Sequence, residues 1–127
     1  MYTIEIINCL SDNYSYICFN DNEAFVVDPS EYTPIKNFLL EKNLDLKFIL
    51  NTHHHHDHIG GNKELKQNYD CKIIAPKKDE KNIPDVDIFV EQDNILNILD
   101  TRCKVFEVPG HTLGHITFYF EALNAAF

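Results

Sequence analysis

The feature that most constrains this chain is a cluster of histidines placed directly after a short apolar segment. Residues Leu46–Leu50 have the composition of a buried strand, and Asn51 and Thr52 join them to the sequence HHHHDH at positions 53–58. Gly60 and Gly61 follow, and glycines allow the backbone to bend sharply and to approach its neighbours. The pattern predicts a polar, histidine-rich site at the end of a strand.

The rest of the chain alternates short apolar runs with turn residues, which predicts strands with a few helices between them. Thr33 before Pro34 is typical of a helix N-cap followed by proline at the first helical position, and it predicts a helix to about Lys42. A second, brief helix is expected over 62–68, and a solvated loop over 77–87. Strands are expected at Ile4–Ile7, Tyr14–Phe19, Ala24–Val27, Leu46–Leu50, Lys72–Ala75, Ile88–Val90, Ile95–Leu99, Lys104–Val108 and Ile116–Phe120.

Length and charge limit the function classes. A chain of 127 residues corresponds to about one domain, so residues 1–127 are expected to form a single unit of the α/β (α+β) class. A formal net charge of −9 disfavours nucleic acid and anionic membranes as partners. No apolar run approaches the roughly 18 residues of a membrane span, and the N-terminus lacks the basic region of a signal peptide. These features predict a cytoplasmic protein whose four scattered cysteines are reduced and mostly buried.

The spacing of the histidines favours a metal site. On an extended segment, His53 and His55 point the same way and can grip one ion, whereas His54 and His56 point away. Asp57 and His58 lie where the chain turns into the glycine pair, which suits them to a second ion and makes them candidate catalytic residues. The alternative, an affinity tag or a solvated loop, fits poorly because the run is internal and follows an apolar strand.

A second segment supplies a further candidate ligand. The sequence PGHTLGH at 109–115 places His111 on a glycine-bounded loop after a strand, whereas His115 is expected to be structural. Three neutral imidazoles with an open fourth position form a catalytic type of zinc site.

These motifs are similar to those of a known family. The H-x-H-x-D-H pattern followed by a distant glycine-bounded histidine resembles the metallo-β-lactamase superfamily. Within it, the segments LSDNYSY (10–16), VVDP (26–29), Thr52–Asn62 and 109–115 together resemble glyoxalase II, the hydroxyacylglutathione hydrolases. The resemblance implies an αββα sandwich, of which this chain corresponds to the N-terminal half.

The resemblance also implies an activity and roles for residues. It implies hydrolysis of a glutathione thioester such as S-lactoylglutathione by a metal-bound hydroxide at a binuclear zinc centre, with iron or manganese as possible metals. His53, His55 and His111 would hold the first metal, and Asp57 and His58 the second. Asp28 would be a carboxylate that orients a ligand.

Several features of the family lie beyond the segments that match. An aspartate that bridges the two metals and a further histidine would have to come after His115, where Glu121 is the one ionisable ligand outside the motif. We therefore expect one firmly bound ion rather than two. We also expect the missing part to supply the second sheet and the outer helices, which would leave an open, apolar sheet that self-associates.

Three functions remain open at this point. The chain could be a thioester hydrolase of glyoxalase II type that is weak or inactive by itself. It could be a metal-binding pseudoenzyme or fragment that acts through a partner. It could also be another hydrolase of the superfamily that works with one metal on a lactam, a lactone or a different thioester.

Overall fold

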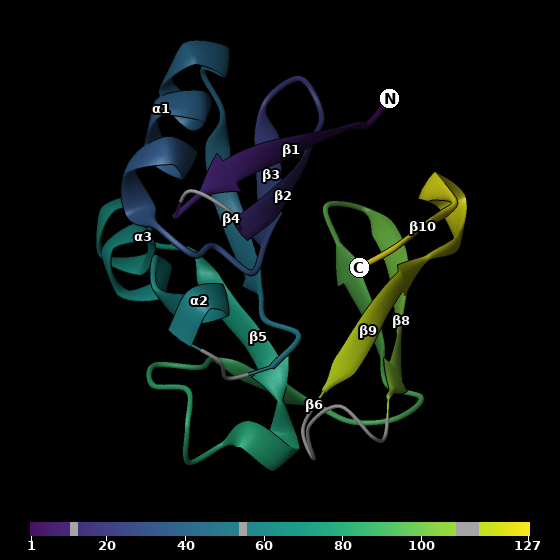
Figure 1. Ribbon diagram of the computed structural model, residues 1–127. Coiled ribbons are helices and arrows are strands. Elements are labelled where there is room, and N and C mark those ends of the chain that lie inside the picture. The colour runs from purple at the N-terminus through teal and green to yellow at the C-terminus, as the bar shows by residue number, and fades with distance from the viewer. Residues whose placement is uncertain (11–12, 54–55, 109–114) are drawn as a thin grey trace.

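The computed structural model describes residues 1–10, 13–53, 56–108 and 115–127, and it shows two β-sheets packed face to face. Figure 1 shows helices α1 and α3 on the outer side of the first sheet and the second sheet on its other side. Within the described residues no helix covers the outer side of the second sheet. The class is α/β (α+β), as the sequence predicts.

The first sheet has six strands in the order β1-β2-β3-β4-β5-β6. The strands are β1 (Thr3–Cys9), β2 (Asn13–Phe19), β3 (Glu23–Val27), β4 (Asp45–Leu50), β5 (Lys72–Pro76) and β6 (Ile88–Val90). β1, β2 and β3 pair antiparallel, whereas β3 to β6 pair parallel. The Oδ1 of Asn20 accepts hydrogen bonds from the N–H groups of Asn22 and Glu23, which closes the predicted hairpin between β2 and β3.

Helices provide the connections that parallel strands require. α1 (Tyr32–Lys42) joins β3 to β4, and α2 (His56–Ile59) and α3 (Asn62–Tyr69) lie between β4 and β5. Asn43 and Asp70 end α1 and α3 in the left-handed conformation, at φ 54° and 52°. The prediction of Thr33 as N-cap is wrong, because the helix begins at Tyr32 after an extended Glu31 and Thr33 lies inside its first turn.

The second sheet corrects the expectation that the chain would lack one. It has four antiparallel strands in the order β10-β9-β8-β7. They are β7 (Ile95–Ile98), β8 (Thr101–Glu107), β9 (Ile116–Phe120) and β10 (Ala125–Ala126). Resemblance assigned this sheet to the missing part of the family fold, yet alternating burial along β8 and β9 shows that they pack on the first sheet.

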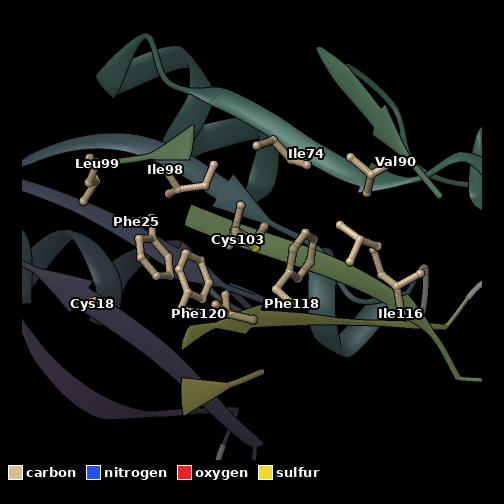
Figure 2. Close-up of a cluster of buried hydrophobic side chains, with 13 residues drawn as sticks. Cys18, Phe25, Ile74, Val90, Ile98, Leu99, Cys103, Ile116, Phe118 and Phe120 are labelled. Atoms are coloured by element: carbon tan, nitrogen blue, oxygen red, sulfur yellow. The ribbon is translucent and has the colours of Figure 1, made fainter. Parts of the chain in front are cut away.

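The main core lies between the two sheets, as Figure 2 shows. Phe25 of the first sheet stacks on Phe120 of the second, with ring centroids 4.9 Å apart. Phe127 packs edge-on against both rings, so the last residue contributes to this core. A second core lies under the helices, where Ile35 and Leu39 of α1 contact the other face of the first sheet.

The segment predicted to be a solvated loop is more ordered than expected. Residues Lys77–Asp79 form a 3₁₀ turn, and Asp79 is buried. Asp79 accepts hydrogen bonds at its backbone carbonyl from the N–H groups of Asn82 and Ile83. The sequence did not predict this turn, because one buried aspartate among exposed lysines cannot be told from an exposed one by composition.

All four cysteines are free and buried, which confirms the prediction from the sequence. Burial raises the pKa of the Cys18 and Cys71 thiols to about 11 and that of the Cys103 thiol to about 12. These three thiols are therefore protonated and weakly nucleophilic at neutral pH. Among the described residues, the helices are too short and too polar for any of them to cross a membrane.

The outer edge of the first sheet exposes apolar side chains. Ile4 and Ile6 of β1 pair with Cys18 and Tyr16, so they lie on the face that the second sheet covers elsewhere. Ile6 and Tyr14 are each 58% exposed on this face. The open apolar edge predicted from the sequence is therefore present, while self-association stays a prediction.

We predict that Phe118→Ala lowers the free energy of unfolding by about 3–5 kcal/mol, because it removes a fully buried ring between the sheets. Phe106→Ala is the matched control, since Phe106 lies on the outer face of the neighbouring strand. Chemical denaturation monitored by circular dichroism measures both. Equal losses for the two variants would contradict the two-sheet packing.

We predict that the isolated chain self-associates through Ile4, Ile6 and Tyr14 and that Ile6→Glu weakens this association, because it places a charge in the contact. Light scattering across a concentration series checks the mass against the 14.8 kDa monomer. Ile95→Glu, a substitution at an exposed position of the second sheet, serves as the control. A monomer at all concentrations would refute the prediction.

Candidate metal centre

The candidate site lies where two neighbouring parallel strands end. Asp28 directly follows β3, and Asn51, Thr52 and His53 directly follow β4. The carboxyl ends of parallel strands meet at one edge of a sheet, so these residues are brought together by the sheet itself. His58 reaches the same place from α2.

Asp28 has a left-handed backbone, with φ of 50°. Aspartate tolerates this conformation better than most residues, but the turn still needs support. The N–H of Asp28 donates to the carbonyl of Leu50 at 2.9 Å, and its own carbonyl accepts from the hydroxyl of Ser15 at 2.7 Å. Hydrogen bonds to residues of β2 and β4, on both sides of β3, therefore hold the Asp28 turn in place.

The carboxylate of Asp28 connects the three segments. Its Oδ1 accepts a hydrogen bond from the N–H of Thr52 at 2.8 Å, and its Oδ2 accepts from the Thr52 hydroxyl at 2.6 Å. Oδ2 also lies 3.1 Å from Nδ1 of His58. Asp28 is only 7% exposed, so these contacts replace most of the water that a carboxylate would otherwise bind.

The direction of these hydrogen bonds determines the tautomers of both histidines. An ionised carboxylate only accepts, so Nδ1 of His58 carries a proton and donates to Asp28. The single hydroxyl hydrogen of Thr52 is given to Asp28, so the contact of 2.9 Å between Thr52 Oγ1 and His53 Nδ1 requires a proton on His53 Nδ1. In both rings Nε2 is then the nitrogen that can bind a metal.

Two imidazoles beside a buried carboxylate form a group that fits a metal centre. Asp28, His53 and His58 each offer a ligand atom within 4.8 Å of the others, and the two imidazole centroids are 4.0 Å apart. Both oxygens of Asp28 are engaged by Thr52 and His58, which places the carboxylate behind the imidazoles as the group that orients them. Neutral imidazoles oriented by a carboxylate in this way are typical of zinc sites in proteins.

His115, which the sequence predicts to be structural, lies against this centre. Its ring stacks on that of His53, with centroids 4.7 Å apart and planes 20° apart. The N–H of Ile116 donates to the carbonyl of Thr52 at 2.9 Å, and the N–H of Val108 donates to the carbonyl of His115. The start of β9 is thus fastened to the segment that carries His53.

The structure brings together three of the predicted site residues, namely Asp28, His53 and His58. Asp57 lies in the short helix α2, where the sequence predicts that the chain turns toward the glycine pair. His55 and His111 lie outside the described residues, as does His54, so their predicted roles stay predictions.

Sequence reasoning missed the residues that support the ligands. Thr52 links Asp28 to His53, and Asn51 and Asn62 form a buried amide pair. Their position next to the histidine motif could have indicated this role, because polar residues at the end of a buried strand need hydrogen-bond partners.

Comparison with known proteins identifies the family. Residues 7–127 match the family model of the metallo-β-lactamase superfamily. The chain belongs to this superfamily. The crystal structure of the BLEG-1 B3 metallo-β-lactamase has a TM-score of 0.90 at 22% identity, and the match covers 98% of this chain and 70% of that chain. At this low sequence identity, the structural match shows a shared fold and no more.

Curated relatives are more similar in sequence. A hydroxyacylglutathione hydrolase of Pelagibacter ubique (strain HTCC1062) is 52% identical over 98% of this chain. A hydroxyacylglutathione hydrolase of Prochlorococcus marinus (strain NATL1A) is 46% identical over the same share. The matches cover 53% and 50% of those two proteins, so this superfamily member spans about half the length of the curated relatives it matches.

We predict that Thr52→Val lowers the affinity for zinc by about 10–100-fold, since valine keeps the shape but removes the link between Asp28 and His53. Competition with a chromophoric chelator measures the affinity. Thr117→Val on β9 is the control. If the two variants bind zinc equally well, Thr52 does not orient His53.

Proposed function

We propose that this chain carries the metal-binding part of a hydroxyacylglutathione hydrolase of glyoxalase II type, which converts S-lactoylglutathione to lactate and glutathione. The observation that carries the proposal is the orientation of His53 and His58 by the buried Asp28 carboxylate in a chain 52% identical to such a hydrolase. The superfamily fold supports metal-dependent hydrolysis, and the relatives support a thioester as the substrate.

The motif positions suggest how the ligands divide. We propose that His53, His55 and His111 hold one metal and that Asp57 and His58 belong to a second site, with zinc as the metal and iron or manganese as alternatives. Three protein ligands hold an ion more firmly than two, so this chain by itself is expected to retain one ion.

A bound zinc ion lowers the pKa of coordinated water to about 7 and so supplies hydroxide at neutral pH. For this chemistry, the Nε2 atoms of His53 and His58 must be free of protons. Asp28 ensures this by holding the Nδ1 protons of His58 directly and of His53 through Thr52. The leaving group would be a thiolate, whose conjugate acid has a pKa of about 8.5, so a dedicated general acid is not required.

The length of the relatives favours a second candidate. Because this chain spans about half of each relative, it could serve as a metal-binding segment whose turnover depends on residues outside these 127. We propose the cytoplasm as its compartment, since buried reduced thiols and a glutathione thioester fit a reducing environment.

We predict at most one tightly bound metal per chain and its loss in His53→Ala, because His53 is one of the three ligands proposed for the retained ion. Inductively coupled plasma mass spectrometry after gel filtration measures the ratio. Lys63→Ala, at an exposed position of α3, is the control. Two ions retained by the isolated chain would show that the ligand count is wrong.

We predict weak or undetectable hydrolysis of S-lactoylglutathione by the isolated chain with zinc, and a clear gain when the C-terminal half of the Pelagibacter ubique relative is added. Loss of thioester absorbance measures the rate, and His53→Ala should abolish the gain. A panel with a β-lactam and a lactone separates the alternatives. Turnover of those substrates without turnover of the thioester would reject the proposal.

A further inference from the structure

Two asparagine side chains form a closed pair beside the candidate metal centre. Nδ2 of Asn62 donates to Oδ1 of Asn51 at 2.7 Å, and Nδ2 of Asn51 donates to Oδ1 of Asn62 at 3.3 Å. Asn51 is 0% exposed and Asn62 is 4% exposed. Each amide thus uses a donor and an acceptor on the other, which offsets the cost of removing both from water.

The pair connects the two ends of the segment that carries the ligands. Asn51 follows β4, and its N–H donates to the carbonyl of Ile74 on β5 at 2.9 Å. Asn62 is the first residue of α3. His53 lies two residues after Asn51 and His58 four residues before Asn62. The amide pair therefore limits how far the backbone on either side of the two histidines can separate.

A second contact fastens the same end of the segment to the Asp28 turn. The N–H of Gly61 donates to the carbonyl of Pro29 at 2.7 Å. A Cβ at position 61 would lie 3.0 Å from the carbonyl oxygen of Pro29 and 3.0 Å from the carbonyl carbon of Glu31, both backbone atoms that cannot move aside easily. Gly61 thus lets α3 begin directly against the residues that follow Asp28.

We propose that the Asn51–Asn62 pair is a positioning clasp that holds His53 and His58 at their metal-binding separation before a metal arrives. Because the ends of the segment 51–62 are already held together, metal binding has a smaller conformational-entropy cost to overcome. An apolar pair could fill the same buried space without hydrogen bonds, so packing by itself does not require two amides. The inference rests on the proposed metal centre and adds residues outside the ligand motif.

The double substitution Asn51→Leu with Asn62→Leu tests the clasp, since it removes both hydrogen bonds and leaves no unpaired amide. Cobalt is the probe, because its visible absorption reports on ligand geometry as well as affinity. We expect cobalt affinity to fall at least about 10-fold, in line with the loss of an outer-shell support. We also expect a changed absorption spectrum. Asn97→Leu, at an exposed position of β7, is the control.

A readout without metal separates positioning from general stability. In the presence of a chelator, the N–H of Thr52 should exchange with deuterium at least about 10-fold faster in the double variant, whereas the N–H of Ile49 inside β4 should be unchanged. If the double variant loses its fold, Asn62→Asp decides instead. It keeps the acceptor for Asn51 Nδ2 and loses the donor, so it should give an intermediate cobalt affinity.

The outcomes separate the clasp from the proposed function. If the unmodified chain binds no cobalt, the proposed metal centre fails, and the exchange rate of the Thr52 N–H still tests the clasp. If the unmodified chain binds cobalt and the variants bind it with the same affinity and spectrum, the clasp is refuted. Equal acceleration of exchange at Thr52 and Ile49 also overturns it, because the pair would then act on the fold as a whole.

Discussion

The candidate site depends on one buried carboxylate. Asp28 is buried, and its carboxylate accepts hydrogen bonds from the Thr52 N–H, the Thr52 hydroxyl and the His58 ring. A buried charge is costly unless it is fully paired, so these contacts constrain one another. Because the Asp28 carboxylate must be paired, the turn after β3, the loop after β4 and the tautomers of two imidazoles depend on one another.

The sheets explain why the carboxylate can occupy this position. β3 and β4 are parallel neighbours, so the residues that follow them emerge side by side. The second sheet packs on the first through apolar side chains, with Phe25 stacked on Phe120. The hydrogen bond from the Ile116 N–H to the Thr52 carbonyl then joins β9 to the site, so the second sheet also supports the ligand segment.

Much of the fold could be predicted from local patterns, and the failures have physical causes. The predicted strands are confirmed within a few residues at their ends, because apolar runs between turn residues reflect burial directly. Thr33 failed as a cap because cap preference is a local tendency, and here Glu31 and not Thr33 adopts the extended backbone. The second sheet was expected to be absent because resemblance located it in a missing half, although the alternation in residues 101–120 already suggested a sheet face.

The sequence by itself determined the candidate ligand types, their spacing and their place at a strand end, since these follow from residue identity and from the period of a strand. Tertiary structure decided which groups meet. The contact of His115 with His53, the link through Thr52 and the Asn51–Asn62 pair join residues whose relation no local pattern encodes. They arise because burial leaves each polar group dependent on whichever partner the packed strands place within hydrogen-bond distance.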